Sequence, residues 1–441
     1  MAPQHPHNPD TPAKERIVVI GGGFAGLTLA KKIDKKKFDV TIIDTNNYHS
    51  FPPLFYQIAS SGVDPTSICF PFRRELRKGS VRGAKYRLGF VKTIDFAARK
   101  VHTQYETVPY DKLVIAAGTT NNFFGNDELL KTVYTIKSAP EAIRCRDEIL
   151  LRMERASLSR DKDFRRRMLT FTVIGGGPTG VEIAGALGEM KRYILKREYP
   201  GIAPEEVNIR LLEGNGRLLG GMSPRSSEKA GEYLQKLMVD VRLNTLMKSY
   251  EGDTLTLSDG TVQEAGMVIW TAGITAMKFE LTGGNPQMGP GGRFTVDRSC
   301  RIAGVSDAYA LGDIAFMTTE ASPKGLPQLA QVAIQQARHL ATELNTGRFS
   351  EFNYHDKGSM ATVGRNLAVA DLPHGHLCGF IAWVAWMFVH LISILGMRNK
   401  LTVLITWIWS YCSYPTSLRL IMRPSKWPLT SSSGKESALR E

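Results

Sequence analysis

Two copies of a glycine-rich segment constrain this chain more than any other feature. The first reads IVVIGGGFAGLTLA at residues 17–30, and the second reads FTVIGGGPTGVEIAGAL at residues 171–187. Each copy joins an apolar run to glycines and then to apolar residues at helical spacing. LVIAAG at 113–118 and VIWTAG at 268–273 recur at nearly the same offset. The sequence therefore predicts two related units of domain length.

Each glycine segment precedes a second apolar run that ends in a carboxylate. FDVTIID ends at Asp44, and VNIRLLE ends at Glu213. The order strand, glycine turn, helix, strand, acid is that of a βαβ unit that binds a dinucleotide. We therefore predict an α/β fold with two Rossmann-like dinucleotide-binding domains.

The glycines have separate expected tasks: a tight turn, close approach of the main chain to a pyrophosphate, and close packing of the helix on its strand. The helix then directs its positive end at phosphate. The strand-end acid would bind a ribose, and in the second copy it favours NADH, because the 2′-phosphate of NADPH would meet like charge. Arg210 and Arg217 lie nearby and leave that preference open, and the second copy could be a decayed repeat. The glycines are Gly21, Gly23 and Gly26, then Gly175, Gly177 and Gly180.

Two dinucleotide sites in one chain imply transfer between two dinucleotides. NADH and FAD are the economical pair, because a flavin accepts a hydride and releases electrons singly or together. VSDAYALGD at 305–313 resembles another short strand after the second unit, so the chain is expected to return and complete the first domain. The predicted parts are 15–125 with 290–355 for FAD, 126–289 for NADH as an insertion, and 356–441 as a C-terminal membrane-anchoring helical region.

The C-terminal region differs from the rest in composition. Residues 377–397 are about as long and apolar as a membrane span, and residues 401–414 are apolar but shorter. Tryptophans and tyrosines here fit an interfacial belt, and the basic residues between the runs fit lipid headgroups. We expect two helices that lie in the membrane surface; a true span or a buried homodimer interface are the alternatives.

Charge and cysteine content exclude several classes. The net charge of +14 accompanies no nucleic-acid-binding module, so no nucleic acid partner is expected. The five cysteines are dispersed without a CxxC pair, which disfavours a disulfide active site or a metal site, and the HGH triplet at 374–376 reads as a loop. The first sixteen residues lack the apolar core of a signal peptide, so we expect the cytoplasmic face of the membrane.

Three further segments resemble a known family. NNYHSFPPLFYQIASSG at 46–62, AYALGDIA at 308–315 and AQVAIQQ at 330–336 are similar to motifs of the two-dinucleotide-binding-domain flavoproteins, and within them of type II NADH dehydrogenases. The resemblance covers about residues 15–424. It implies non-covalent FAD in the first domain, and transfer of two electrons from NADH to a membrane quinone without proton pumping. We also expect the chain to form a homodimer.

The resemblance also assigns roles to single residues. It places Asp313 on the flavin ribityl chain, Gln331 and Gln335 at the quinone, Glu182 near the nicotinamide and flavin, and Lys357 on the quinone side of the flavin. From the residues alone, the two glutamines could be a polar helix face, Glu182 could stabilise a helix terminus, and Lys357 could be a surface lysine. Further cofactor-binding positions are expected at Phe24, Ala25, Val91, Ala117, Gly118 and Gly273.

Other functions stay open at this point. A sulfide:quinone oxidoreductase or a disulfide reductase would need redox cysteines near the flavin, and a soluble ferredoxin reductase would lack the apolar C-terminus. Another flavoprotein reductase of the same fold, or a non-enzymatic protein that binds NAD and FAD at a membrane, would keep both glycine motifs. Turnover of NADH with a soluble quinone separates these alternatives.

Overall fold

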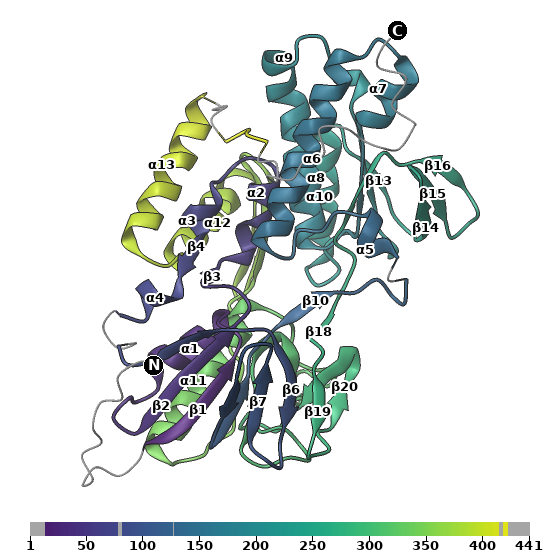
Figure 1. Cartoon of the computed structure of the whole chain (residues 1–441). Helices are drawn as coiled ribbons and strands as arrows, with labels where there is room; N and C mark the ends of the chain where they lie inside the picture. Colours follow the sequence, from purple (N-terminus) through teal and green to yellow (C-terminus); the bar gives the residue numbers. More distant parts are fainter. Residues whose placement is uncertain (1–13, 78–81, 127, 414–417, 422–441) are drawn as a thin grey trace.

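The first glycine segment lies at the centre of a parallel sheet. In the computed structural model, which describes residues 14–77, 82–126, 128–413 and 418–421, the strand order of this sheet is β22-β9-β1-β2-β5. All four pairings are parallel, and helix α1 (Phe24–Lys32) joins β1 to β2 (Figure 1). The strands are β1 (Glu15–Ile20), β2 (Phe38–Asp44), β5 (Lys85–Leu88), β9 (Lys112–Ile115) and β22 (Ala308–Ala310).

The second glycine segment occupies the same place in a second parallel sheet. Its order is β13-β12-β11-β17, and helix α8 (Pro178–Glu189) follows β11 as α1 follows β1. A π-helical turn at Met190–Ile194 carries α8 into α9 (Leu195–Glu198). The strands are β11 (Thr170–Ile174), β12 (Asn208–Leu212), β13 (Asp240–Arg242) and β17 (Met267–Trp270), and the covering helices are α6 (Ala139–Leu158), α7 (Lys162–Met168) and α10 (Pro224–Lys236).

The second unit is inserted in the first. Strand β22 follows the whole second unit in sequence yet pairs with β9 of the first sheet, which confirms the predicted return of the chain. The two connecting segments, β10 (Thr119–Asn121) and β18 (Ile274–Ala276), pair antiparallel at the waist between the two halves (Figure 1). An inserted domain requires its entry and exit to lie close together, and this pair provides that.

Smaller sheets complete the two halves: one is antiparallel, and two are mixed, because β19 pairs parallel with β6 and β21 pairs parallel with β23. The four-stranded one has the order β19-β6-β7-β8, and three-stranded ones have the orders β14-β15-β16 and β20-β21-β23. Their strands are β6 (Val91–Asp95), β7 (Lys100–Thr103), β8 (Thr107–Pro109), β14 (Met247–Glu251), β15 (Thr254–Leu257), β16 (Val262–Glu264), β19 (Glu280–Thr282), β20 (Met288–Gly289), β21 (Arg293–Thr295) and β23 (Ala315–Phe316).

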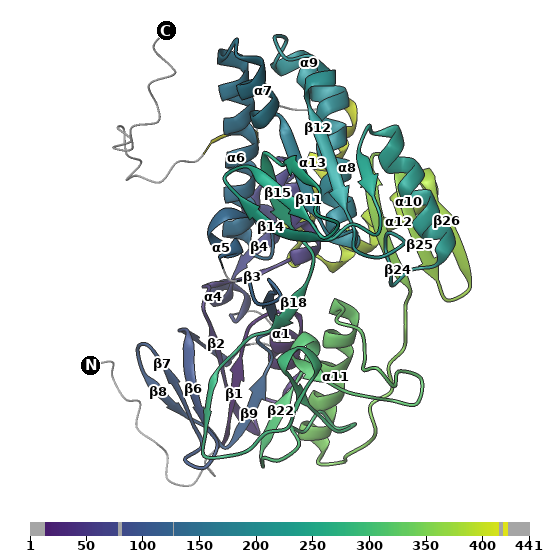
Figure 2. The same cartoon turned by 90° about the vertical axis from the view of Figure 1, so that its right-hand side faces the viewer.

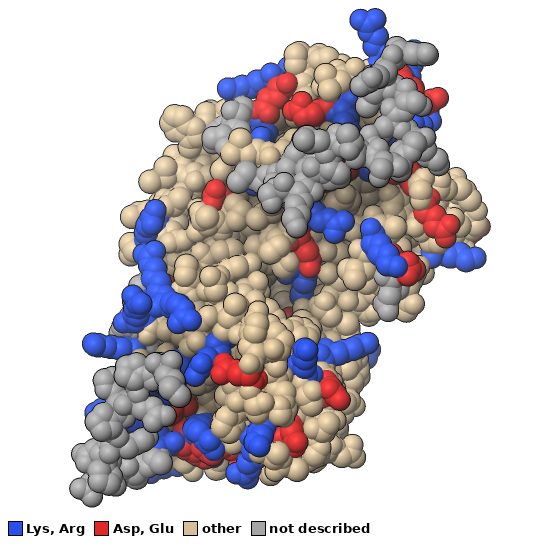
Figure 3. All heavy atoms as spheres, in the orientation of Figure 1, with Lys and Arg blue, Asp and Glu red and all other residues tan. Residues whose placement is uncertain are grey.

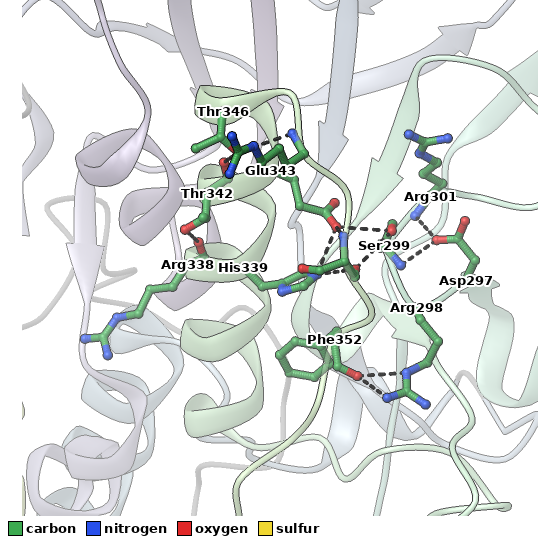
Figure 4. A network of polar contacts seen from close by, with 12 residues as sticks. Asp297, Arg298, Ser299, Arg301, Arg338, His339, Thr342, Glu343, Thr346 and Phe352 are labelled. Carbon is green, nitrogen blue, oxygen red and sulfur yellow. Dashed lines mark hydrogen bonds and ion pairs between the residues drawn. The ribbon is translucent and has the colours of Figure 1, made fainter.

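Helix α11 (Ala330–Thr346) packs against α1 and is tied down by a buried carboxylate. Glu343 is 1% exposed, and its Oε1 accepts hydrogen bonds from the Ser350 main-chain N–H at 2.7 Å and from Ser299 Oγ at 3.2 Å (Figure 4). His339 Nε2 lies 3.2 Å from the same oxygen. A buried carboxylate is costly without such partners, so this network fixes α11 relative to the returning part of the first domain.

The C-terminal region forms a small sheet and two helices against the second unit (Figure 2). The strands β24 (Ser359–Gly364), β25 (Leu367–Leu372) and β26 (Gly375–Cys378) are antiparallel, and α12 (Gly379–Ser393) packs on β25. Helix α8 packs on β24 so closely that a Cβ at Gly185 would lie 1.8 Å from the Val363 carbonyl oxygen. Glycine at this position therefore allows the helix and strand to touch.

The apolar stretch predicted at 377–397 is not one helix. Its first residues belong to β26, α12 ends at Ser393, and after Gly396, at φ +76°, the chain begins α13 (Met397–Ser413). Within the described residues, no helix combines the length and apolarity of a membrane span. Tyr414 and the polar tail from 422 lie outside the described residues.

Both ends of α13 are held by side chains that bind main-chain carbonyls. At its start, Asn399 Nδ2 donates to the carbonyls of Thr66 and Ser67, both at 3.1 Å, in helix α3 (Pro65–Ile68). At its end, Arg365 donates to the carbonyls of Ser410 (2.7 Å) and Tyr411 (2.9 Å). Cations satisfy the free carbonyls of a helix C-terminus and complement its dipole.

Candidate functional site

The two glycine turns have the same backbone geometry. Gly21 and Gly175 adopt φ of +96° and +106°, in the region that favours glycine. A Cβ at Gly21 would lie 2.4 Å from the Ala116 carbonyl oxygen, and one at Gly175 would lie 2.8 Å from Ala272 Cα. Each turn therefore needs glycine twice over, for its φ angle and for its contact with the strand-end segment of LVIAAG or VIWTAG.

The strand-end acids lie against these turns. The Gly22 N–H donates to Asp44 Oδ2 at 2.7 Å, and the Gly176 N–H donates to Glu213 Oε2 at 2.6 Å. The second oxygen of each acid accepts from the main-chain N–H two residues ahead, Asn46 at 2.8 Å and Asn215 at 2.7 Å. Burial raises the pKa of Asp44, partly offset by these hydrogen bonds. Both acids are thus fixed at the mouths of their turns.

Of the remaining glycines of each turn, one is tightly packed against the main chain and the other has open space beside it. A Cβ at Gly26 would lie 1.9 Å from the Gly21 oxygen, and one at Gly180 would lie 1.8 Å from the Gly175 oxygen. A Cβ at Gly23 or Gly177 would meet no described atom within 4 Å. These two residues are the N-caps of α1 and α8, neither with a side-chain cap. The space beside each helix N-terminus is therefore open, as phosphate binding requires.

Beside the first turn lies a buried histidine. His49 is 4% exposed, and its Nδ1–H donates to the Gly22 carbonyl at 2.8 Å. Burial lowers the pKa of His49 to about 4, so its ring is neutral near pH 7. Phe24, at the start of α1, packs edge-on against His49 and Phe51, with ring centroids 5.7 Å apart in both pairs. His49 was not predicted as a site residue.

Asp313 lies at the end of the first sheet among basic side chains. Burial raises the pKa of Asp313, and the charges of Lys137 and Arg293 oppose that rise. Lys137 Nζ donates to Thr119 Oγ1 at 2.8 Å, while the Gly312 N–H donates to the buried Gln336 Oε1 at 2.8 Å. The sequence analysis missed these partners, because Lys137 belongs to the inserted unit and nothing local connects it to residue 313.

The other predicted cofactor positions lie in both units, at the ends of strands or in α1 and β6. Ala25 is buried in α1, and Val91 is buried at the start of β6. Ala117 and Gly118 follow β9, with Gly118 at φ +68°. Gly273 follows β17 at φ +148°, and its carbonyl accepts from the Asn122 N–H at 3.1 Å. Gly118 and Gly273 thus end corresponding strands of the two units.

Gln331, Gln335 and Lys357 come together at the start of α11. Gln335 Nε2 donates to the His355 carbonyl at 2.9 Å, and its Oε1 accepts from the His355 N–H at 3.0 Å. Gln331 Nε2 donates to the Gly358 carbonyl at 3.1 Å, and its Oε1 accepts from the Lys357 N–H at 3.0 Å. The two amides are therefore engaged with the main chain of 355–358, the segment that carries Lys357 into β24.

Glu182 lies elsewhere, in the wall of an aromatic cavity of about 150 Å³. The cavity is bounded by α8, β24, α12, α13 and α2 (Phe55–Ala59), and its lining includes Tyr56, Glu182, Thr362, Trp383, Trp386 and Trp407. Burial raises the pKa of Glu182 well above its ordinary value. Glu189, two turns further along α8, lines the same cavity and accepts a hydrogen bond from the Arg365 N–H at 2.6 Å.

Comparison with known proteins agrees with this architecture. The family model described as pyridine nucleotide-disulphide oxidoreductase matches residues 15–337, and the NDH2 C-terminal domain matches residues 356–412. The type II NADH:quinone oxidoreductase Ndh of Mycobacterium tuberculosis is 35% identical over 94% of this chain and 91% of its own length. The chain belongs to the type II NADH:quinone oxidoreductase family. The predicted family and fold class are thereby confirmed.

Relatives of this type II oxidoreductase extend to plants and parasites. The internal alternative NAD(P)H-ubiquinone oxidoreductase A1 of Arabidopsis thaliana is 28% identical over 90% of this chain and 84% of its own. The structure of NDH2 from Plasmodium falciparum in complex with NADH has a TM-score of 0.85 at 21% identity, covering 93% of this chain and all of that one. The latter likeness extends the shared fold across the C-terminal region.

The cysteines set this type II oxidoreductase apart from the disulphide enzymes in the description of its family model. All five cysteines are free. Burial raises the pKa of Cys69 to about 12, so its thiol stays protonated, and Cys145 and Cys300 are fully buried. Buried, protonated thiols are poor nucleophiles.

Proposed function

We propose that this chain oxidises NADH bound at the second glycine turn, through FAD held non-covalently at the first, and reduces a membrane quinone. The observation that carries the proposal is the pair of matching turns, each with an acid at its mouth and an open helix N-terminus. Dinucleotides bind such turns by pyrophosphate and ribose. A bound flavin would accept hydride from NADH and deliver two electrons to the quinone.

The residues at the first turn fit FAD. Gly23 leaves room for a pyrophosphate, and Asp44 presents a carboxylate to an adenosine ribose. After β22, at the other edge of the sheet from β5, Asp313 and Lys137 offer an acceptor and a cation to the polar chain of a flavin. We assign Phe24, Ala25, Val91, Ala117 and Gly118 to the walls of this site. Non-covalent binding follows the family resemblance.

The second turn supports NADH as the donor. Glu213 is held by hydrogen bonds from Gly176 and Asn215, so its carboxylate is fixed where a 2′-phosphate would lie. The two nearby arginines are engaged with main-chain carbonyls: Arg210 with Glu264 at 2.7 Å, and Arg217 with Gly220 at 2.6 Å and Met222 at 3.0 Å. They are therefore poorly placed to neutralise that phosphate, which favours NADH over NADPH.

We assign the aromatic cavity to the quinone ring. Pockets for drug-sized ligands have volumes of about 300–1,000 Å³, so a cavity of about 150 Å³ suits one ring rather than a dinucleotide. The raised pKa of Glu182 favours the protonated form of its carboxyl. Glu182 can therefore donate a proton to a quinone oxygen as that oxygen gains charge, and regain one from solution.

Gln331 and Gln335 support the same reaction by holding segment 355–358. Their amides bind the main chain on both sides of Asp356, so Lys357 has a fixed backbone. We propose that these residues and Lys357 form the quinone side of the flavin site. A direct hydrogen bond from either amide to a quinone would require one of the observed bonds to open.

Helices α12 and α13 supply the membrane-facing surface. Their outer faces expose large apolar side chains, and Figure 3 shows mainly uncharged atoms over α13 with lysine and arginine side chains at its lower end. Apolar surface beside cations suits an anionic lipid surface. We propose monotopic docking of a homodimer on the cytoplasmic face. The most exposed members are Phe380, Ile381, Phe388, Ile392, Met397, Leu401, Ile405, Ile408 and Trp409.

The test is turnover by the purified full chain. We expect rapid oxidation of NADH with a water-soluble quinone, slower oxidation of NADPH, and free FAD in the supernatant after denaturation. Sedimentation with vesicles that contain anionic lipid should separate docked from free protein. Absence of quinone-dependent NADH oxidation in a flavin-loaded sample would refute the proposal.

A further inference from the structure

Helix α2 brings a tyrosine hydroxyl to the cavity that we assign to the quinone. Tyr56 is 7% exposed and lines the cavity together with Glu182 and Glu189. Its ring packs edge-on against Trp386 of α12, with centroids 6.4 Å apart. Tyr56 therefore lies where the second unit, the first unit and the C-terminal helices meet.

The hydroxyl of Tyr56 is oriented by a chain of hydrogen bonds that begins in α13. Trp407 Nε1 donates to Gln57 Oε1 at 2.9 Å, and Gln57 Nε2 donates to Tyr56 Oη at 2.9 Å. An indole N–H can only donate, so the oxygen of the Gln57 amide must face Trp407 and its NH₂ must face Tyr56. This settles the orientation of the amide by chemistry.

The same chain leaves the Tyr56 hydrogen unused. Because Oη accepts from Gln57, the O–H of Tyr56 is available to another acceptor, and within the described residues none is bonded to it. A buried hydroxyl without an acceptor is costly. A ligand with a carbonyl oxygen in the cavity would satisfy it.

We infer that Tyr56 donates its hydroxyl hydrogen to a carbonyl oxygen of the bound quinone, and that Gln57, held by Trp407, positions it. This inference rests on the proposed function. The overall reaction, NADH + quinone + H⁺ → NAD⁺ + quinol, is unchanged, because Tyr56 keeps its proton. Its hydrogen bond strengthens as the oxygen gains negative charge, so it stabilises the transition state more than the ground state.

The electrostatic setting of Tyr56 agrees with a donor that does not ionise. Burial, with the nearby carboxyls of Glu182 and Glu189, raises the pKa of Tyr56 well above its ordinary value. The hydroxyl therefore stays protonated over the working pH range. Because Trp407 lies on α13, a correctly docked membrane helix is required to orient the donor.

The experiment compares Tyr56→Phe with the native full-length enzyme. We expect flavin reduction by NADH and turnover with ferricyanide, an acceptor without a carbonyl, to stay the same. The kcat/KM for a soluble quinone should fall about tenfold, as for loss of a hydrogen bond to a charged oxygen. Tyr105→Phe, which removes the hydroxyl of a tyrosine that is 71% exposed and lies outside the cavity lining, is the matched control and should stay within twofold of native.

Gln57→Leu tests the positioning role. It should lower kcat for the quinone with little change in KM, and Tyr56→Phe/Gln57→Leu should be no worse than Tyr56→Phe alone, because both changes remove one interaction. Full quinone turnover in Tyr56→Phe, equal loss in Tyr105→Phe, or additive losses in the double variant would each overturn the inference. If native enzyme fails to reduce the quinone, the proposed function itself fails.

Discussion

The two glycine turns match internally but are fastened differently. In the first unit the Gly22 carbonyl accepts from the ring of His49, whereas in the second unit the Gly176 carbonyl accepts from the main-chain N–H of Leu219, at 2.8 Å in both. Protonation of His49 keeps the hydrogen bond of this histidine latch but places a charge on a buried ring, which destabilises the first turn. The contact at the second turn contains no titratable group. Two turns with the same backbone geometry can thus differ in how their ligand sites respond to pH.

The helices after the turns also differ in what they pack against. Helix α1 is covered by α11, while α8 packs on β24 and turns Glu182 and Glu189 to the aromatic cavity. In the proposed function, α8 therefore contributes to the NADH site at its N-terminus and to the quinone cavity on its flank, whereas α1 contributes to the FAD site.

The largest difference between the two units is expected at low pH, which should destabilise the first unit more than the second. The folded pKa of His49, about 4, lies below its ordinary value of 6.5, so its contribution to stability is complete above pH 6.5 and is lost as the pH falls through 4. A shift of that size corresponds to about 3 kcal/mol. We expect flavin release, followed by fluorescence, before the second unit unfolds.

His49→Asn should flatten that pH dependence, because an amide can donate to Gly22 without titrating. His390 on α12 has the same ordinary and folded pKa values, so His390→Asn is the matched control and should leave flavin release unchanged. Identical release curves for native enzyme and His49→Asn would show that the histidine latch does not govern the first unit.

Alanine at Gly23 or Gly177 should weaken the binding of a different ligand in each case, flavin in the first and NADH in the second. Gly23→Ala and Gly177→Ala each place a methyl group where no described atom lies within 4 Å, so both variants should fold. Crowding of a bound pyrophosphate should cost about 2 kcal/mol, roughly thirtyfold in affinity. We expect Gly23→Ala to lose flavin, and Gly177→Ala to keep flavin but bind NADH weakly in titrations. Loss of flavin from both would contradict the assignment.

Removing the charge of Glu213 should reduce the preference for NADH over NADPH. Glu213→Gln abolishes the charge that a 2′-phosphate would meet, so the ratio of kcat/KM for NADH over NADPH should fall roughly tenfold. Asp44→Asn makes the corresponding change in the first unit and should weaken flavin binding without altering that ratio. Steady-state rates with both donors decide the matter, and an unchanged ratio in Glu213→Gln would remove the argument for NADH.

The smallest effect is expected at Gln335. Its amide makes two hydrogen bonds to His355, and Gln335→Ala should loosen segment 355–358 at a cost of about 1 kcal/mol, roughly fivefold in quinone kcat/KM. Stopped-flow reduction of bound flavin by NADH should be nearly unchanged. Equal slowing of both half-reactions would place Gln335 in the flavin site generally.

Local patterns were sufficient to predict the two parallel sheets. IGGG after an apolar run, with Asp44 or Glu213 at the next strand end, fixes a turn whose geometry hardly depends on the rest of the chain. The return of β22 could also be predicted, because VSDAYALGD resembles a further short strand and follows the whole second unit. Hydropathy misjudged 377–397, since it could not detect the turn at Gly396 or the pairing of β26.

The cavity could not be predicted in the same way. Tyr56, Glu182, Thr362, Trp386 and Trp407 come from five separate elements, and no periodicity connects them. Tyr56 and Gln57 lay inside a segment already noted for its family resemblance, but their roles depend on Trp407, some 350 residues further along the chain. Tertiary packing alone brings these side chains together.

The way α13 is fastened leaves most of its length free to vary. Asn399 grips one end and Arg365 the other, each through main-chain oxygens that every amino acid possesses. Val403, Trp407 and Tyr411 add side-chain contacts to the rest of the protein: Val403 is buried, Trp407 donates to Gln57, and Tyr411 packs against Trp383 with ring centroids 5.6 Å apart. The outward residues could therefore be exchanged to suit bilayers of different thickness or headgroup charge. The outward face of α13 could therefore be substituted, by evolution or by design, to suit another membrane while the two nucleotide-binding units stay unchanged.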